Sequence, residues 1–372
     1  MTSDPQAPPP SDPAAEGQFP CRQCGAKMAF DPTAASIKCP YCGHENVIPQ
    51  SQEQIEELDF HKVLARSVAA EDMQEVLTVN CAACGAETTL EPNVAADACP
   101  FCGSTLSAEQ HSSRKIKPRS LLPFAVNRDQ AFGAFRDWLK GLWFAPNKLK
   151  HYARSDVSTL NGLYVPYWTY DCNTVSAYTG ERGEDYWETR TRTDSKGNTR
   201  TQQVRKTRWY RTSGVVYNSF DDILVLASTS LPKKHADELE PWDLHNLVAY
   251  DTAYLAGFRA ENYQVDLEEG FHEAQRIMDD PIRESIKRDI GGDRQRIHSV
   301  RTEYNNVTFK HLLLPVWISA YRFKDRVFRF LVNARTGEVQ GERPWSWWKI
   351  ALAVAAGVAV IATVAYLAGA FN

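Results

Sequence analysis

The stretch CRQCGAKMAFDPTAASIKCPYCG, residues 21–43, returns sixty positions later as CAACGAETTLEPNVAADACPFCG, residues 81–103. Each copy holds two Cys-x-x-Cys pairs separated by fourteen residues. Two such pairs on facing turns supply four thiolates to one tetrahedral metal ion. The repeat therefore predicts two four-cysteine zinc ribbons, over 18–50 and 78–107. The predicted ligands are Cys21, Cys24, Cys39, Cys42, Cys81, Cys84, Cys99 and Cys102.

A glycine directly follows every Cys pair, where a tight metal-binding turn needs a permissive backbone. Disulfides or buried thiols are the alternative interpretation of the cysteines, but the doubled spacing favours metal. Four thiolates fill the coordination shell of Zn²⁺ and leave no water to activate, so we expect two structural zinc ions. Metal thiolates also indicate a reducing compartment. The ninth cysteine, Cys172, lies in an aromatic stretch and receives no role.

The C-terminal end of the chain is apolar. Residues 350–371 contain no charge, which as a helix is long enough to cross a bilayer. Trp345, Trp347 and Trp348 precede this stretch, and Arg343 and Lys349 flank its N-terminal side. The sequence predicts a single transmembrane helix over 347–371 that leaves the bulk of the chain in the cytoplasm, at the inner membrane. A buried core helix is the alternative.

The segments around the predicted ribbons have simpler patterns. Residues 1–17 are rich in Pro, Ala and Ser and contain no signal-peptide core, so we expect a disordered tail. A capping box at Ser51 and Gln54 predicts a helical spacer over 51–77. Residues 108–120 carry four basic residues and no acid after His111, which is typical of a linker.

Residues 121–346 form the largest predicted domain, and its pattern mixes helices with strands. Apolar periodicity predicts helices over Asn127–Trp143 and Leu267–Ile290. Pro281 is expected to kink the second of these or to start a new helix. A Leu-x-x-Pro-x-Trp pattern occurs at Leu163–Trp168 and again at Leu312–Trp317. Three strands are indicated from Thr308 onward, as in a meander. The predicted fold class is α+β, with antiparallel β meanders between two zinc ribbons and one transmembrane helix.

Residues 186–211 alternate threonine and arginine around Ser195–Asn198, as expected of a long exposed hairpin. Eight basic residues outnumber two acidic ones, so the hairpin can lie on phosphates of anionic lipid or of nucleic acid. A solvated two-stranded arm is the alternative.

The sequence lacks the motifs of several enzyme classes. It contains no Walker A loop, no Gly-x-Ser-x-Gly elbow, and a His272-Glu273 pair that is not completed to His-Glu-x-x-His. The formal net charge of −4 does not favour nucleic acid as a partner. We therefore expect a protein that is not an enzyme.

Several motifs are similar to those of a bacterial family of membrane-anchored TFIIB-type zinc-ribbon proteins. Members are often catalogued as primosomal protein N′ (replication factor Y), superfamily II helicase. The resemblance rests on the two cysteine repeats, Leu122–Phe124, Trp138–Phe144, Val165–Trp168, Leu314–Trp317, Val332–Asn333 and Gly337–Val339. It implies a recruiting or scaffolding role near SPFH-domain and phage-shock-type membrane proteins.

Two functional hypotheses follow. The first is a membrane-tethered, zinc-binding scaffold that recruits protein partners, with Phe30, Tyr41, Phe101 and Leu106 as contact candidates or as parts of the ribbon cores. The second is a membrane-associated nucleic-acid-binding protein in replication or transcription control. The few basic residues inside the ribbons weigh against the second. A hydrolase within residues 121–346 is a third alternative.

Overall fold

The computed structural model describes residues 19–48, 55–65, 73–83, 85–88, 99–101, 104, 106, 110–146, 160–193, 199–323, 326–343 and 345–370. The tail predicted over 1–17 lies outside these residues. The chain has an α+β architecture with mainly antiparallel sheets, which confirms the predicted class at this level.

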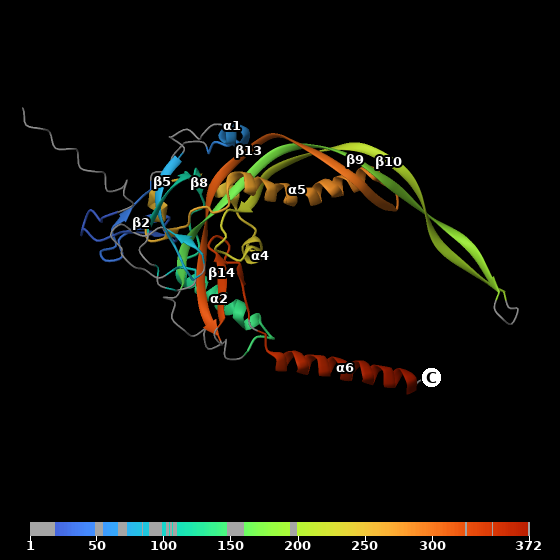
Figure 1. Cartoon of the computed structure of the whole chain (residues 1–372). Helices are drawn as coiled ribbons and strands as arrows, with labels where there is room; N and C mark the ends of the chain where they lie inside the picture. Colours follow the sequence, from blue (N-terminus) through green and yellow to red (C-terminus); the bar gives the residue numbers. More distant parts are fainter. Residues whose placement is uncertain are drawn as a thin grey trace, which may run out of the picture.

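A large sheet forms the centre of the molecule (Figure 1). Its main strands run in the order β10-β9-β13-β14-β15 and each pair is antiparallel. Short strands β4, β8, β11 and β12 complete it. The bounds are Asn161–Thr193 for β9, Thr199–Leu226 for β10, Arg294–Phe323 for β13, Arg326–Asn333 for β14, Val339–Gly341 for β15, Leu58–Asp59 for β4, Ser120–Leu121 for β8, Val248–Ala249 for β11 and Arg259–Ala260 for β12.

The two Leu-x-x-Pro-x-Trp segments lie side by side in this sheet. In the antiparallel register of β9 and β13, Pro166 is opposite Leu313 and Pro315 is opposite Tyr164. Almost every residue of the two segments is buried, because both faces of the sheet are covered here. Continuous apolar runs are what such doubly covered strands require.

Helix α5, Leu267–Ile290, covers one face of β9, β10 and β13 (Figure 1). From Cys172 onward the even-numbered residues of β9 face this helix and are buried, up to Gly180. The start of α5 is fixed by two side-chain donors, since Trp168 Nε1 donates to the Val265 carbonyl at 2.9 Å and the Tyr170 hydroxyl donates to that of Leu267 at 2.7 Å. Gly270 allows this approach, because a Cβ there would lie 2.5 Å from the Tyr170 hydroxyl.

Helix α2, Arg128–Gly141, confirms the helix predicted from Asn127. The Asn127 side chain accepts from the Gln130 N–H and the Gln130 side chain accepts from the Asn127 N–H, both at 2.9 Å. This capping box satisfies two backbone donors at the helix start. The apolar side of α2 packs beside β14 and β15 through Phe132, Phe135 and Leu139.

The remaining elements are short, apart from the C-terminal helix. Helix α6, Trp347–Ala370, is the predicted apolar helix. Its first 21 residues have a mean hydropathy of 2.4, and none of the residues in their most apolar stretch is buried against the rest of the protein. It is therefore long and apolar enough to span a membrane. Among the described residues, the other helices are α1, Phe60–Ala65, and α4, Lys233–Asp237, with 3₁₀ turns η3, Leu244–Asn246, and η4, Thr252–Leu255.

Three local predictions differ from the structure. The helix predicted over 51–77 appears in the described residues only as α1, because β4 precedes it and β5 already begins at Met73. The capping box at Ser51 lies outside the described residues. The linker predicted over 108–120 contains two strands, β7 and β8. Pro281 neither kinks nor divides α5, since it lies on the exposed side of a continuous helix.

A buried lysine ties the segment before α1 to the sheet. Lys310 Nζ lies 2.8 Å from Asp222, 3.1 Å from Glu57 and 3.7 Å from Asp171. Burial by itself lowers the pKa of Lys310, but the hydrogen bond to Asp222 and the charge of Asp171 raise that pKa above its usual value. Burial raises the pKa of Asp171 to about 6, against the opposing effects of the Asp222 N–H and of Lys310.

Replacing the buried lysine should destabilise the protein in a pH-dependent way. We expect Lys310→Met to lower the free energy of unfolding by about 3–5 kcal/mol at neutral pH, because three carboxylates lose their counter-charge. The folded pKa of Asp171 exceeds its unfolded value of about 3.9. Lys310 lowers the pKa of Asp171, so its loss should raise that pKa further in the variant. The folded variant then takes up the proton at a higher pH than the folded wild type, and the deficit should shrink as the pH falls from about 7 to 5.

The measurement is thermal unfolding of the full chain in detergent, as the difference between variant and wild type at each pH. The control is Lys287→Met, which removes an exposed ion pair with Glu284 and should change little at either pH. A Lys310→Met deficit that stays constant with pH would contradict this account.

Candidate metal centre

Four cysteines meet at one point in the first predicted ribbon, which folds around strands β1, Ala29–Asp31, β2, Ser36–Lys38, and β3, Glu45–Asn46. The Sγ atoms of Cys21, Cys24, Cys39 and Cys42 all lie within 4.8 Å of one another. The sulfurs of Cys21 and Cys42 are 3.5 Å apart, as are those of Cys24 and Cys39. Thiolates at about 2.3 Å from a tetrahedral ion would be about 3.8 Å apart. The four cysteines can therefore bind a metal ion.

In the first ribbon, each Cys pair and the glycine after it form a tight turn, here called a knuckle. In the first knuckle the Gly25 N–H donates to the Cys21 carbonyl at 2.8 Å, and in the second the Gly43 N–H donates to that of Cys39 at 3.0 Å. Both glycines have a positive φ, 74° and 75°, a region in which other residues are strained. The glycines predicted from sequence thus have the conformation that the turns require.

The charges of the four sulfurs also favour a cation. Backbone N–H groups, first that of Cys42, lower the pKa of Cys39 to about 6. The His44 N–H acts in the same direction on Cys42, but burial and the three neighbouring sulfurs raise the pKa of Cys42 to about 12. Four thiolates this close repel one another, so a full set of thiolates needs a bound cation.

The second predicted ribbon repeats the same backbone geometry in its described residues. It is built on β5, Met73–Asn80, β6, Glu87–Thr88, and β7, Gln110–Ile116. The Gly85 N–H donates to the Cys81 carbonyl at 2.8 Å, and Gly85 has a φ of 76°. The Cys99 N–H donates to Ser104 at 2.8 Å, as Cys39 does to His44 at 2.9 Å. Cys81 and Cys99 are buried, and the other two predicted ligands, Cys84 and Cys102, lie outside the described residues.

The first ribbon packs on the central domain. Phe30 contacts Tyr254 edge-on, with ring centroids 5.4 Å apart, and lies 6.4 Å from Phe258. The Phe30 N–H donates to the Ala256 carbonyl at 2.9 Å. Its core residues share one apolar cluster with α2 and β14. This ribbon is therefore a fixed part of the body.

The second ribbon packs on the other part of the sheet. Val79, Cys81, Cys99, Phe101 and Leu106 share a cluster with the odd-numbered residues of β9 and with β13. Phe101 and Leu106 are almost completely inaccessible to solvent. The core of the second predicted ribbon thus covers part of the sheet that α5 leaves uncovered.

The two ribbons differ at one repeated position. Tyr41 and Phe101 occupy the same place in the Cys-Pro-x-Cys-Gly sequence. Tyr41 is 82% exposed, whereas Phe101 is buried in the central core. Of the four contact candidates named from sequence, Phe30, Phe101 and Leu106 are core residues and Tyr41 alone is on the surface. Sequence could not separate them, because burial depends on how each ribbon docks.

Two other places could be considered for chemistry. Carboxylates of Asp171, Asp221 and Asp222 lie close together, but the Lys310 ammonium already pairs with Asp171 and Asp222.

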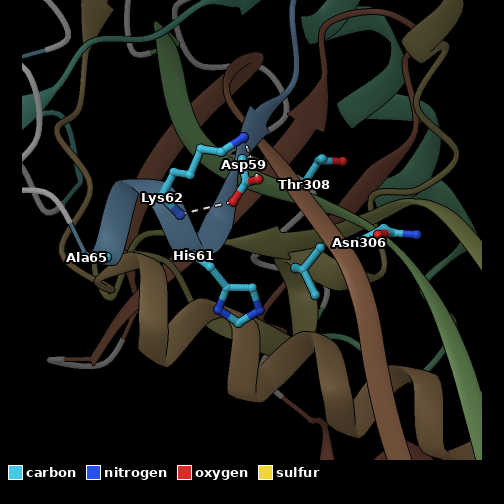
Figure 2. Close-up of a pocket in the computed structure, with 7 residues that line it drawn as sticks. Asp59, His61, Lys62, Ala65, Asn306 and Thr308 are labelled. Atoms are coloured by element: carbon cyan, nitrogen blue, oxygen red, sulfur yellow. Dashed lines mark hydrogen bonds and ion pairs between the residues drawn. The ribbon is translucent and has the colours of Figure 1, made fainter.

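The second place is a pocket of about 440 Å³ between α1 and β13, and Figure 2 shows His61 and Lys62 on one wall and Asn306 on the other. Its Asp59 is paired with Lys62 at 3.1 Å, and its Thr308 hydroxyl donates to Glu57. In the first place Lys310, and in the second Lys62, already pairs with neighbouring carboxylates.

Cys172 is a core residue, as its sequence context suggested. Its sulfur lies 3.5 Å from that of Met278 in α5, and burial raises the pKa of its thiol to about 11. A protonated, buried thiol is a poor nucleophile and a poor metal ligand.

The comparisons with known proteins give one relative of note. The chain is 29% identical over 341 residues to the uncharacterized protein YdjG of Bacillus subtilis (strain 168), a match that covers 90% of this chain and 92% of that protein. No protein-family model and no solved structure matches the chain.

Metal content should follow the two cysteine repeats. Elemental analysis of the purified full chain should give two metal ions per chain. The double variant Cys21→Ser, Cys39→Ser should retain one ion, because it removes buried ligands from the first ribbon only. Cys172→Ala is the matched control and should keep both. A wild-type chain with no bound metal, or a double variant that keeps two ions, would refute the assignment.

Proposed function

We propose that this chain is a non-enzymatic scaffold that α6 holds to the membrane and whose structural zinc ribbons present a rigid surface to protein partners. The observation that carries the proposal is the asymmetry of the ribbons. Both ribbons pack on the central sheet, yet Tyr41, in the second knuckle of the first ribbon, is exposed. Four thiolates close the metal coordination, so the metal has a structural role and provides no site for a substrate.

Zinc is the metal that the donor set favours. Four thiolates at tetrahedral spacing suit Zn²⁺ or an iron centre. Zinc has no redox chemistry and is the usual metal of ribbons built from two Cys-x-x-Cys turns. Its binding would contribute to the stability of each ribbon, whose own apolar core is small.

Membrane attachment rests on α6. The helix is apolar, and the side chains of its span make no buried core in the described residues. Arg343 and Lys349 lie at its N-terminal end, so the positive-inside rule puts the domain on the cytoplasmic side of the inner membrane. A buried core helix, the alternative from sequence, would need apolar neighbours.

The surface offered to a protein partner is the exposed side of the first ribbon. Val47, which like Tyr41 belongs to the first ribbon, is 84% exposed. Aromatic side chains on a rigid support are favourable contact residues, because they lose little conformational entropy on binding. Partners from membrane systems with SPFH-domain or phage-shock-type proteins are the ones that the family resemblance implies.

The basic arm supports a second role at the membrane. We call the arm residues 184–193 and 199–208, where β9 pairs only with β10. One face carries Arg190, Lys206 and Arg208 beside Glu184 and Glu188, and both Arg190 and Lys206 pair with Glu188. The guanidinium of Arg208 lies 5.2 Å from the ring centre of Tyr186. Figure 1 shows the arm and α6 leaving the body on the same side. Anionic lipid is thus a nearer source of phosphate than nucleic acid, the rival partner.

Removing α6 should release the chain from the membrane. A chain that ends before Trp345 should move from the membrane pellet to the supernatant on cell fractionation, because it loses its apolar span. A control chain with α6 replaced by an unrelated apolar span of equal length should stay in the pellet. Retention of the truncated chain in carbonate-washed membranes would contradict the anchor.

Partner binding should depend on the exposed knuckle and not on tyrosine exposure in general. Cross-linking and affinity purification of Tyr41→Ser, Val47→Ser from detergent-solubilised membranes should lose a specific protein, with both metal ions retained. Tyr217→Ser is the matched control, since Tyr217 is 75% exposed on β10. Unchanged protein partners together with loss of bound DNA in arm variants would favour the nucleic-acid alternative.

A further inference from the structure

Exposed tryptophans gather at one corner of the molecule. Of the ten tryptophans, five are exposed. Four of these belong to the same place, namely Trp143, which is 82% exposed, and Trp345, Trp347 and Trp348 at the start of α6. The fifth, Trp187, lies on the arm. Figure 1 shows the end of α2 and the start of α6 at the same end of the body.

A tight turn after α2 directs its aromatic side chains outward. Leu142 and Ala145 are both buried, and the two residues between them, Trp143 and Phe144, are exposed. The Ala145 N–H donates to the Leu142 carbonyl at 3.3 Å and closes the turn. Because both ends of the turn are buried in the core, the aromatic side chains of Trp143 and Phe144 stay exposed to solvent.

The same turn holds the first residues of α6. The Ser346 N–H donates to the Phe144 carbonyl at 2.7 Å, and Lys349 Nζ donates to the Ala145 carbonyl at 2.8 Å. The rings of Phe144 and Trp345 have centroids 6.5 Å apart. The start of the apolar helix is therefore fixed to the folded domain by direct contacts.

The composition of this surface suits the headgroup region of a bilayer. Tryptophan combines an apolar ring with a polar N–H and is enriched at that depth. The guanidinium of Arg343 lies 4.6 Å from the ring centre of Trp345, which places a cation beside the aromatic cluster. Basic groups here face anionic lipid headgroups favourably. Exposed aromatic side chains that gather in one place usually mark a surface that contacts a membrane or a partner.

We propose that Trp143 and Phe144, together with Trp345, Trp347 and Trp348, form one lipid-contacting surface that seats the folded domain on the membrane beside α6. The proposal rests on the proposed span of α6, and its occupant is the phospholipid headgroup layer. It adds that the domain has a defined orientation on the membrane, whereas a tether alone would leave the orientation free. The arm and the exposed knuckle of the first ribbon would then face fixed directions.

The test is fluorine NMR of the full chain labelled with fluorotryptophan in nanodiscs of phosphatidylglycerol and phosphatidylethanolamine. Single Trp→Phe variants assign the resonances. A small fraction of lipid carries a gadolinium chelate on its headgroup, which broadens signals of nearby nuclei. We expect the resonance of Trp143 to broaden as strongly as those of Trp347 and Trp348. The resonance of the buried Trp168 is the control and should stay sharp.

The outcomes distinguish the proposed lipid-contacting surface from the proposed membrane-spanning role of α6. If the signals of Trp347 and Trp348 broaden while that of Trp143 stays as sharp as Trp168, the surface is refuted and the span stands. If none of the four corner signals broadens, both the surface and the membrane span fail. The wild-type chain gives the readout, and each variant serves only for assignment, in which the loss of one resonance with the others unchanged identifies the tryptophan.

Discussion

The antiparallel pairing of β9 with β13 is the interaction on which the rest of the molecule depends. These two long strands are buried on both faces where their Leu-x-x-Pro-x-Trp segments meet, and each face needs a cover. On one face, α5 covers Trp168, and the cluster of α2 and the first ribbon covers Tyr164 and Trp317. The core of the second ribbon covers much of the other face. Beyond Cys172 the cover becomes one-sided, and alternation of buried and exposed residues replaces the continuous apolar run. Beyond Gly183, the pairing with β13 ends and the hairpin continues alone as the arm.

This arrangement changes what a metal site contributes. A zinc ribbon on a flexible linker would affect only its own residues when the metal is lost. Here Cys81 and Cys99 belong to the same apolar cluster as β9, and Cys21 and Cys39 belong to the cluster of α2. Loss of the proposed metal ions would then expose parts of the central core, because the ribbon residues that cover it are held by their knuckles. On this proposal, metal binding, domain stability and the position of the exposed Tyr41 are coupled through packing.

A buried cluster of charged groups also holds distant segments of the chain together. Lys310 is almost completely buried, and its three carboxylate neighbours come from β9, from β10 and from the segment before α1. Such a cluster stabilises one arrangement of the chain, because any separation leaves charge uncompensated in a low dielectric. It also accounts for the acidic group near Asp222 without a metal ion there. The proposed roles at the membrane therefore fall to surface features, the knuckle, the arm and the aromatic corner.

The sequence by itself determined the features whose information is local. Cysteine spacing predicted the four-sulfur cluster of the first ribbon, and glycine after each pair predicted the turns, because both requirements act within a few residues. Periodicity predicted α2, α5, the hairpin and the apolar α6. Tertiary structure alone decided where the ribbons dock, and hence why Tyr41 is exposed while Phe101, its counterpart in the repeat, is buried. It also decided that 51–77 is no continuous helix, since strand pairing of β4 with β13 and of β5 with β7 outweighs local helix preference. Burial depends on contacts between distant segments, and no pattern within a repeat encodes them.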